Sequence, residues 1–215
     1  MGKAPFSTSE EHGLGLISSR DLLIYSVGIS TGGIAEIRMA QLNPNRKIIA
    51  TTIDTKGADF AKQRIIEAGL NDRIEVKIED ISQPLLYRES YFDFIYARLV
   101  LHYLPKQKLE NTLRELHRIL KPDKKLFVVV RSIDCPDAKK EGTIFNPETC
   151  LTTCKGQDYE YSRYFHTEKS ISNALAKAGF ANLSVNSFDE QLFIDFERTM
   201  LLPHPDNVIE VTAMK

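Results

Sequence analysis

The segment Gly28-Ile29-Ser30-Thr31-Gly32-Gly33 carries residue types that can hold a nucleotide. It stands between an apolar run and a helical pattern, where glycines allow a tight turn and a close approach of the backbone to a ligand. The free N–H groups at the start of the next helix favour an anionic group. Asp54 follows roughly 20 residues later, a spacing that lets a carboxylate accept hydrogen bonds from ribose hydroxyls. The pattern therefore predicts a nucleotide site.

The same turn admits two other interpretations. The run from Gly28 to Gly32 also fits the G-x-S-x-G pattern of a serine hydrolase, with Ser30 as the nucleophile. Its position argues against this, because the nucleophile turn of that fold follows several strands and only one precedes it here. In the third interpretation the chain uses glycine only to turn. A Walker-type phosphate loop is excluded, because Ile34 and Ala35 stand where lysine and serine or threonine are required.

The elements that position these residues alternate between strand and helix patterns. Alternation of this kind is typical of an α/β fold with a parallel sheet. Short apolar or β-branched runs predict strands at 22–27, 47–53, 73–78, 92–97, 126–131, 181–187 and 207–214. Apolar residues at helical spacing predict helices at 34–42, 57–69 and 107–120, and a further helix between Thr167 and Gly179.

Two segments fall outside this alternation. Residues 1–20 are polar and glycine-containing, so we expect a loose N-terminal leader or lid. Residues 132–166 lack clear periodicity, and a connection of that length is typical of a functional lid or insert. The insert follows a strand and would lie over the carboxyl edge of the sheet, where ligands bind in open α/β folds. The prediction is a single domain over 21–215 with a substrate lid at 132–166.

Composition limits the class of protein. The chain has 215 residues, a formal net charge of −1, 42% hydrophobic and 27% charged residues, which predicts one globular domain. The neutral balance argues against a nucleic-acid partner bound through its phosphates. Apolar runs such as 126–130 are far shorter than the ~18 residues of a membrane span. We see no secretory signal, and three cysteines fit a reducing compartment, so we expect a cytoplasmic protein.

A metal site is not predicted. Cys150 and Cys154 form a C-x-x-x-C pair, and Cys135 and His166 are further candidate ligands. A structural zinc site needs a second closely spaced pair of ligands, and the sequence has none.

A second segment is more specific than the glycine turn. The string FDFIYARLVLHYLP occupies 92–105, and LRELHRILKP follows at 113–122. With these strings the chain resembles the class I S-adenosylmethionine-dependent methyltransferases, especially the small-molecule branch that includes ubiquinone- and menaquinone-biosynthesis enzymes. The resemblance covers about residues 20–131 well and 160–215 weakly.

The resemblance implies a fold, a cofactor and a reaction. The fold would be Rossmann-like and doubly wound, with a seven-stranded, mostly parallel sheet and one antiparallel strand near the C-terminus. The cofactor would be S-adenosyl-L-methionine, and its methyl group would pass to a small-molecule acceptor. A homodimer is compatible with this family.

The resemblance also assigns cofactor-binding residues. Asp54 would hold the ribose, and Asp80 and Ile81 would contact the adenine amine and ring. Three further groups complete the site: Gly28, Ser30 and Gly32 along the methionine part, Thr55 with Ile53 beside the adenine, and Ala97, Arg98 and Leu99 near the methionyl end.

Two departures from the family pattern support a second hypothesis. Members usually carry an acid where Ser26 stands and glycine where Ser30 stands. The alternative is therefore a cofactor-binding domain without methyl-transfer activity.

One residue is a candidate for catalysis. Methyl transfer is an in-line displacement that needs an aligned acceptor and, for a protonated acceptor, removal of its proton. His102 follows the fourth strand at the carboxyl edge and is the nearest candidate base. A packed histidine on a short helix is the alternative interpretation.

Overall fold

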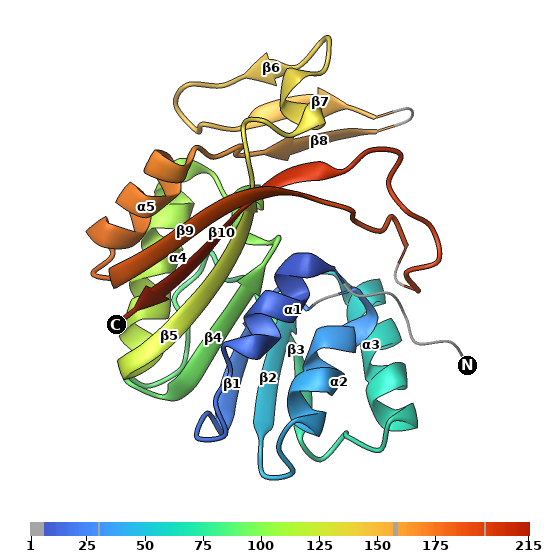
Figure 1. Ribbon diagram of the computed structural model, residues 1–215, viewed down its shortest axis with the longest axis vertical. Coiled ribbons are helices and arrows are strands. Elements are labelled where there is room, and N and C mark those ends of the chain that lie inside the picture. The colour runs from blue at the N-terminus through green and yellow to red at the C-terminus, as the bar shows by residue number, and fades with distance from the viewer. Residues whose placement is uncertain (1–6, 30, 157–158, 196) are drawn as a thin grey trace.

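The computed structural model describes residues 7–29, 31–156, 159–195 and 197–215. Within these ranges a seven-stranded sheet has the strand order β3-β2-β1-β4-β5-β10-β9 (Figure 1). Its strands are β1 (Leu23–Val27), β2 (Lys47–Thr52), β3 (Ile74–Ile78), β4 (Phe92–Arg98), β5 (Leu120–Arg131), β9 (Ala181–Glu190) and β10 (Asp206–Met214). β10 is antiparallel to both of its neighbours, whereas the pairs from β3 to β5 are parallel. The predicted sheet is confirmed.

Burial explains which runs became central strands. All but the last residue of β4 is buried, as are the last six residues of β5, and most of these buried positions are apolar. β3 lies at the edge and has mixed exposure, in line with its alternating sequence. The chain builds the sheet outward from β1 on one side and from β4 on the other. In open α/β sheets a ligand crevice forms at such a reversal, at the carboxyl ends of the strands.

Helices cover both faces of the sheet (Figure 1). One face carries α1 (Thr8–Gly15), α2 (Ile34–Gln41) and α3 (Thr55–Glu67), and the other carries α4 (Lys106–Ile119) and α5 (Glu168–Lys177). The α4 stripe of Leu109, Leu113 and Leu116 is buried in the core on its side. Met39 and Ile65 belong to the core on the opposite side. Short 3-10 segments lie at Thr31–Gly33, Leu101–Tyr103 and Pro136–Lys139.

The segment predicted as a loose leader contains a helix. α1 buries Ser9, Glu10, Gly13 and Leu14 against the rest of the chain. Its sequence has no apolar stripe, and it is held by hydrogen bonds and ion pairs of Ser9 and Glu10 together with the apolar packing of Leu14. Periodicity could not reveal such a helix.

The insert at 132–166 contains a small antiparallel sheet with the order β6-β7-β8. The strands are β6 (Ile144–Phe145), β7 (Thr152–Lys155) and β8 (Glu160–Arg163), and they lie beyond the carboxyl end of β5 (Figure 1). Cys135, Cys154 and Phe165 form a separate small core beneath it. Within the described ranges, none of the helices combines the length and the apolar character needed to cross a bilayer.

Candidate functional site

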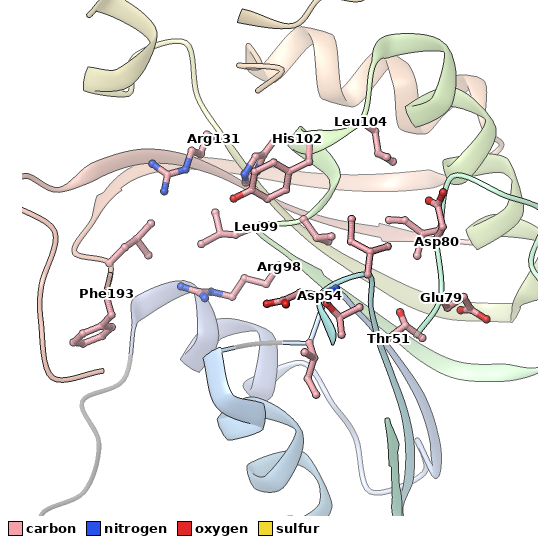
Figure 2. A pocket seen from close by; sticks show the side chains of 18 of the residues that line it. Thr51, Asp54, Glu79, Asp80, Arg98, Leu99, His102, Leu104, Arg131 and Phe193 are labelled. Atoms are coloured by element: carbon pink, nitrogen blue, oxygen red, sulfur yellow. Dashed lines mark hydrogen bonds between the residues drawn. The ribbon is translucent and has the colours of Figure 1, made fainter. Parts of the chain in front are cut away.

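A cavity of about 540 Å³ lies at the carboxyl ends of the parallel strands. Figure 2 shows that it runs from Asp80 and Glu79 on one side to Arg131 and Phe193 on the other. Its lining comprises Ser7, Gly28, Ile29, Thr51, Thr52, Ile53, Asp54, Glu79, Asp80, Ile81, Arg98, Leu99, Val100, His102, Tyr103, Leu104, Arg131, Leu192, Phe193 and Arg198. We call the part around Asp54, Glu79 and Asp80 the acidic end, and the part around Arg98, His102, Arg131 and Arg198 the basic end.

Gly28 follows β1, lines the cavity and begins the turn that leads to α2. Its φ is 71°, a left-handed conformation that favours glycine. A Cβ at this position would lie 2.5 Å from Cγ2 of Val100, so a side chain would also clash with the loop after β4. Ile29 N donates to Thr51 O at 2.7 Å, which ties the turn to β2.

Asp54 follows β2 and is the N-cap of α3. Its Oδ1 accepts a hydrogen bond from Lys56 N at 3.0 Å, which satisfies one of the free N–H groups of the helix. The side chain is exposed to the cavity, and its Oδ2 accepts no hydrogen bond from the residues that the structure describes. One carboxylate oxygen is therefore available to a ligand hydroxyl.

Glu79 and Asp80 follow β3 and differ in their surroundings. Glu79 accepts hydrogen bonds from the hydroxyls of Tyr25 and of Tyr87, the latter at 3.1 Å. Burial and the Glu79 carboxylate raise the pKa of Tyr25 well above its ordinary range. Asp80 is exposed, and the hydrogen bond from Ser82 N, at 2.9 Å, lowers its pKa. The Asp80 carboxylate is therefore ionised at neutral pH.

The basic end is held by contacts between segments far apart in the chain. Arg98, at the end of β4, donates to Ser9 Oγ at 2.7 Å and to Ser7 Oγ at 2.6 Å. Its guanidinium also lies 3.4 Å from Glu190, at the end of β9. Arg198 forms an ion pair with the buried Glu10 of α1. These contacts fix the N-terminal helix beside the cavity.

His102 and Arg131 form the inner wall of the basic end (Figure 2). The His102 side chain is 0% exposed, and burial, followed by the charges of Arg131 and Arg163, lowers its pKa well below the ordinary value. The imidazole is therefore neutral at physiological pH. Arg131 forms a buried ion pair with Asp206 of β10.

The structure places most of the predicted site residues at this one cavity. Gly28, Asp54, Asp80, Ile81, Arg98 and His102 line it. Thr55, at the start of α3, Gly32, in the turn, and Ala97, buried inside β4, lie outside the lining. Ser30 lies outside the described residues, and the serine-nucleophile hypothesis lies there with it.

Sequence reasoning missed several residues of the site. Arg131 ends a buried strand, and an arginine at that position was a usable signal. Leu192, Phe193 and Arg198 come from a stretch without periodicity, which gave no signal. The hydroxyl of Ser26 donates to the buried Glu36 of α2 at 2.6 Å, so a carboxylate lies beside the serine that replaces the family's acid.

The donor set fits a nucleoside with a charged tail. The cavity has the size of ordinary small-molecule sites. Asp54 offers a carboxylate oxygen for ribose, Ile53 and Ile81 offer apolar surface for a base, and Gly28 allows close approach of the backbone. Across the described ranges, no group of three or more His, Cys, Asp and Glu side chains is arranged to hold a metal ion.

Comparisons with known proteins agree with this geometry. Residues 24–123 match the family described as a methyltransferase domain. A demethylmenaquinone methyltransferase from Lactobacillus johnsonii is 24% identical over 168 residues, which cover 74% of this chain and 68% of that protein. An O-methyltransferase from Aspergillus flavus is 47% identical over 47 residues, which cover 22% of this chain and only 19% of that protein.

A solved structure shares the fold over almost the whole chain. The S-adenosylmethionine-dependent methyltransferase from Methanosarcina mazei has a TM-score of 0.67 and 21% identity, and the match covers 94% of this chain and 95% of that one. The fold similarity therefore extends through β9 and β10, beyond the matched domain.

Proposed function

We propose that this chain is a class I S-adenosylmethionine-dependent methyltransferase and that it transfers a methyl group from S-adenosyl-L-methionine to a small-molecule acceptor. One observation carries the proposal. One cavity contains both ends. The acidic end has side chains of the types that bind a nucleoside, and the basic end is buried and has largely apolar walls. A donor and an acceptor can thus meet in one space.

The cofactor roles follow the chain's own side chains. Asp54 would accept hydrogen bonds from the ribose hydroxyls, and Asp80 and Ile81 would lie against the adenine. Gly28, Ser30 and Gly32 would border the methionine part, with Thr55 beside the adenine and Ala97 and Arg98 near the methionyl end. The exposed carboxylate of Asp54 and the positive φ of Gly28 support these roles.

The bound cofactor supplies an electrophilic methyl group on a sulfonium. The protein must exclude water and align the acceptor for in-line attack. Ser7, the N-cap of α1, lines the cavity, and Arg98 and Glu190 hold α1 beside it. The insert at 132–166 would close another side. His102, neutral in the folded protein, would accept the proton of a protonated acceptor.

Several finer assignments belong to the same proposal. The free thiols of Cys135, Cys150 and Cys154 support a location in the reducing cytoplasm. The reaction would fall in class EC 2.1.1, with a small molecule and no nucleic acid as partner. The relative from Lactobacillus johnsonii, named as a demethylmenaquinone methyltransferase, supports the small-molecule branch of the family. A homodimer is compatible with this function.

Calorimetry on the full chain tests the proposal. S-adenosylmethionine and S-adenosylhomocysteine should each bind at one site, and formation of S-adenosylhomocysteine should follow addition of a panel of hydroxyl, amine and thiol acceptors. No binding of either compound contradicts the proposal. Binding without turnover across the panel favours the alternative of a cofactor-binding domain without transfer, which the Ser26 and Ser30 departures support.

A further inference from the structure

Glu36 places a buried carboxylate beside the strand that leads into the glycine turn. It belongs to the first turn of α2 and is 0% exposed. The hydroxyl of Ser26, on β1, donates to its Oε1 at 2.6 Å. Ser26 is itself buried and stands two residues before Gly28, which lines the cavity. The carboxylate therefore lies one hydrogen bond away from the strand position where the family pattern has an acid.

The surroundings of Glu36 favour a negative charge. The start of a helix is the positive end of its dipole, and Glu36 is the acid in the first turn of α2. The hydrogen bond from Ser26 also stabilises the charged form of the carboxylate. Because water screens a buried charge little, such a charge acts over a longer range than a charge at the surface.

The charge of Glu36 reaches the basic end of the cavity. Tyr96, on β4, is buried, and burial raises the pKa of its hydroxyl well above the ordinary range. Four charges act on that same hydroxyl, those of Arg98, Glu10, Glu36 and Arg198. Arg98 and Arg198 line the cavity. Glu36 is therefore within electrostatic range of the part of the cavity that would receive the methionyl end of the cofactor.

The lining itself offers little negative charge at that end. A sulfonium is a permanent cation without N–H or O–H groups, so nearby negative charge stabilises it and its own hydrogen bonds cannot. Among the described residues that line the cavity, the carboxylates are those of Asp54, Glu79 and Asp80, all at the acidic end. The charged side chains that line the basic end are arginines. A carboxylate behind the lining can supply the negative charge that this end lacks.

We propose that Glu36 is the counter-charge for the sulfonium of S-adenosylmethionine and that it makes the site prefer this cofactor to S-adenosylhomocysteine. Glu36 acts through its electric field and not by contact, so its burial is compatible with the role. Loss of the methyl group removes the positive charge from the sulfur, so the preference favours exchange of the product for new cofactor. The inference rests on the proposed function, because it places the methionyl end of the cofactor at the basic end.

Calorimetry on the full chain compares three ligands: S-adenosylmethionine, S-adenosylhomocysteine and sinefungin, which carries an ammonium in place of the sulfonium. Glu36→Gln keeps the size of the side chain and an acceptor for Ser26 but removes the charge. Its affinity for the two cationic ligands should fall about tenfold, as loss of a charge ~10 Å from a cation implies at an effective dielectric constant of ~20. Its affinity for S-adenosylhomocysteine, whose methionyl end has no net charge, should change by no more than about threefold. A merely structural role would weaken all three ligands alike.

Two double variants separate the charge from the fold. Ser26→Ala with Glu36→Met replaces both members of the buried hydrogen bond by apolar groups, so the protein should stay folded and lose the preference as Glu36→Gln does. Ser26→Asp with Glu36→Gln returns a carboxylate to β1, beside an amide that can donate to it. This variant should recover the preference of the unmodified chain to within about threefold.

Asp93→Asn is the matched control. Asp93 is also a buried acid, but it lies near the start of β4, at the edge of the sheet opposite the cavity. Its carboxylate accepts from Leu22 N and Leu23 N and pairs with Lys121. This variant should lower the Tm and leave the ratio of the affinities for S-adenosylmethionine and S-adenosylhomocysteine unchanged.

Three results would overturn the counter-charge: an unchanged affinity ratio in Glu36→Gln and in the apolar double variant, no recovery in Ser26→Asp with Glu36→Gln, or an equal change of the ratio in Asp93→Asn. Failure of the proposed function shows differently. If the unmodified chain bound neither ligand, both proposals would be wrong. Binding without turnover would contradict methyl transfer alone, and the affinity ratio would still measure the role of Glu36.

Discussion

The two ends of the cavity are built in opposite ways. At the acidic end, Asp54 and Asp80 are exposed, and each carboxylate accepts a hydrogen bond from a backbone N–H two residues further along the chain. At the basic end, charged side chains are buried, and their partners come from distant segments: Arg131 pairs with Asp206, and Arg98 contacts Ser9 and Glu190.

Stability and ligand binding are therefore coupled differently at the two ends. A carboxylate capped by its own turn can change without disturbing the fold, so substitutions at the acidic end should act mainly on ligand affinity. A buried ion pair joins two strands, so substitutions at the basic end should act first on the free energy of unfolding. Substitutions at both ends and a pH series test this contrast, and the largest effect is expected at a buried ion pair.

Asp206→Ala should give the largest loss of stability. It leaves the Arg131 guanidinium buried without its carboxylate and removes the acceptor of the Cys135 thiol, 3.1 Å away. We expect a decrease of about 3–5 kcal/mol in the free energy of unfolding, the usual cost of breaking a buried pair. Urea denaturation followed by circular dichroism measures it.

The matched control is the exposed pair of Asp134 and Lys139, which lie 2.9 Å apart. Asp134→Ala should change stability by no more than about 1 kcal/mol, because solvent screens a surface pair. Equal losses of stability in the two variants would contradict a larger contribution of the buried ion pair than of the exposed one.

Mild acid should lower the free energy of unfolding through His166, a buried histidine outside the cavity lining. Burial lowers the pKa of His166 to about 3, whereas an unfolded histidine titrates near 6.5. Below pH ~6.5 the unfolded chain therefore binds a proton that the folded chain does not, so stability is complete above that pH and falls as the pH decreases. At pH 4.5 this single residue should cost about 2–3 kcal/mol.

His166→Phe isolates that contribution. The variant loses the contact with Ser170 at every pH, but its stability should fall less steeply than that of the unmodified chain between pH 6.5 and 4.5. Parallel pH profiles of the two proteins, measured by urea denaturation, would contradict the buried, neutral state of His166.

The same contrast explains what the sequence predicts and what it does not. Strand and helix runs such as 47–53 and 107–120 appear directly as β2 and α4, because local periodicity decides them. Gly28 and Asp54 could also be predicted, since each is positioned by a single strand-turn-helix unit, β1 to α2 for Gly28 and β2 to α3 for Asp54. Arg198 was not, because its ion pair with Glu10 joins the two ends of the chain.

Substitutions at the acidic end should lower the affinity for S-adenosylhomocysteine and hardly change the free energy of unfolding. Asp54→Ser keeps an oxygen that can cap α3, because serine is as good an N-cap as aspartate, but it removes the second carboxylate oxygen facing the cavity. We expect the affinity for S-adenosylhomocysteine to fall about tenfold to a hundredfold, as loss of charged hydrogen bonds to ribose implies. Isothermal calorimetry and thermal denaturation of the same samples measure both quantities.

Asp80→Asn, at the same end, should cause a smaller loss of affinity than Asp54→Ser. The amide oxygen can still accept from Ser82 N, so the local turn is kept and only an exposed charge is lost. Affinity should fall by no more than about fivefold, because water screens an exposed group. A larger loss for Asp80→Asn than for Asp54→Ser would shift the main nucleoside contact from the second strand to the third. A loss of stability in either variant, comparable to that of Asp206→Ala, would mean that both ends are built alike.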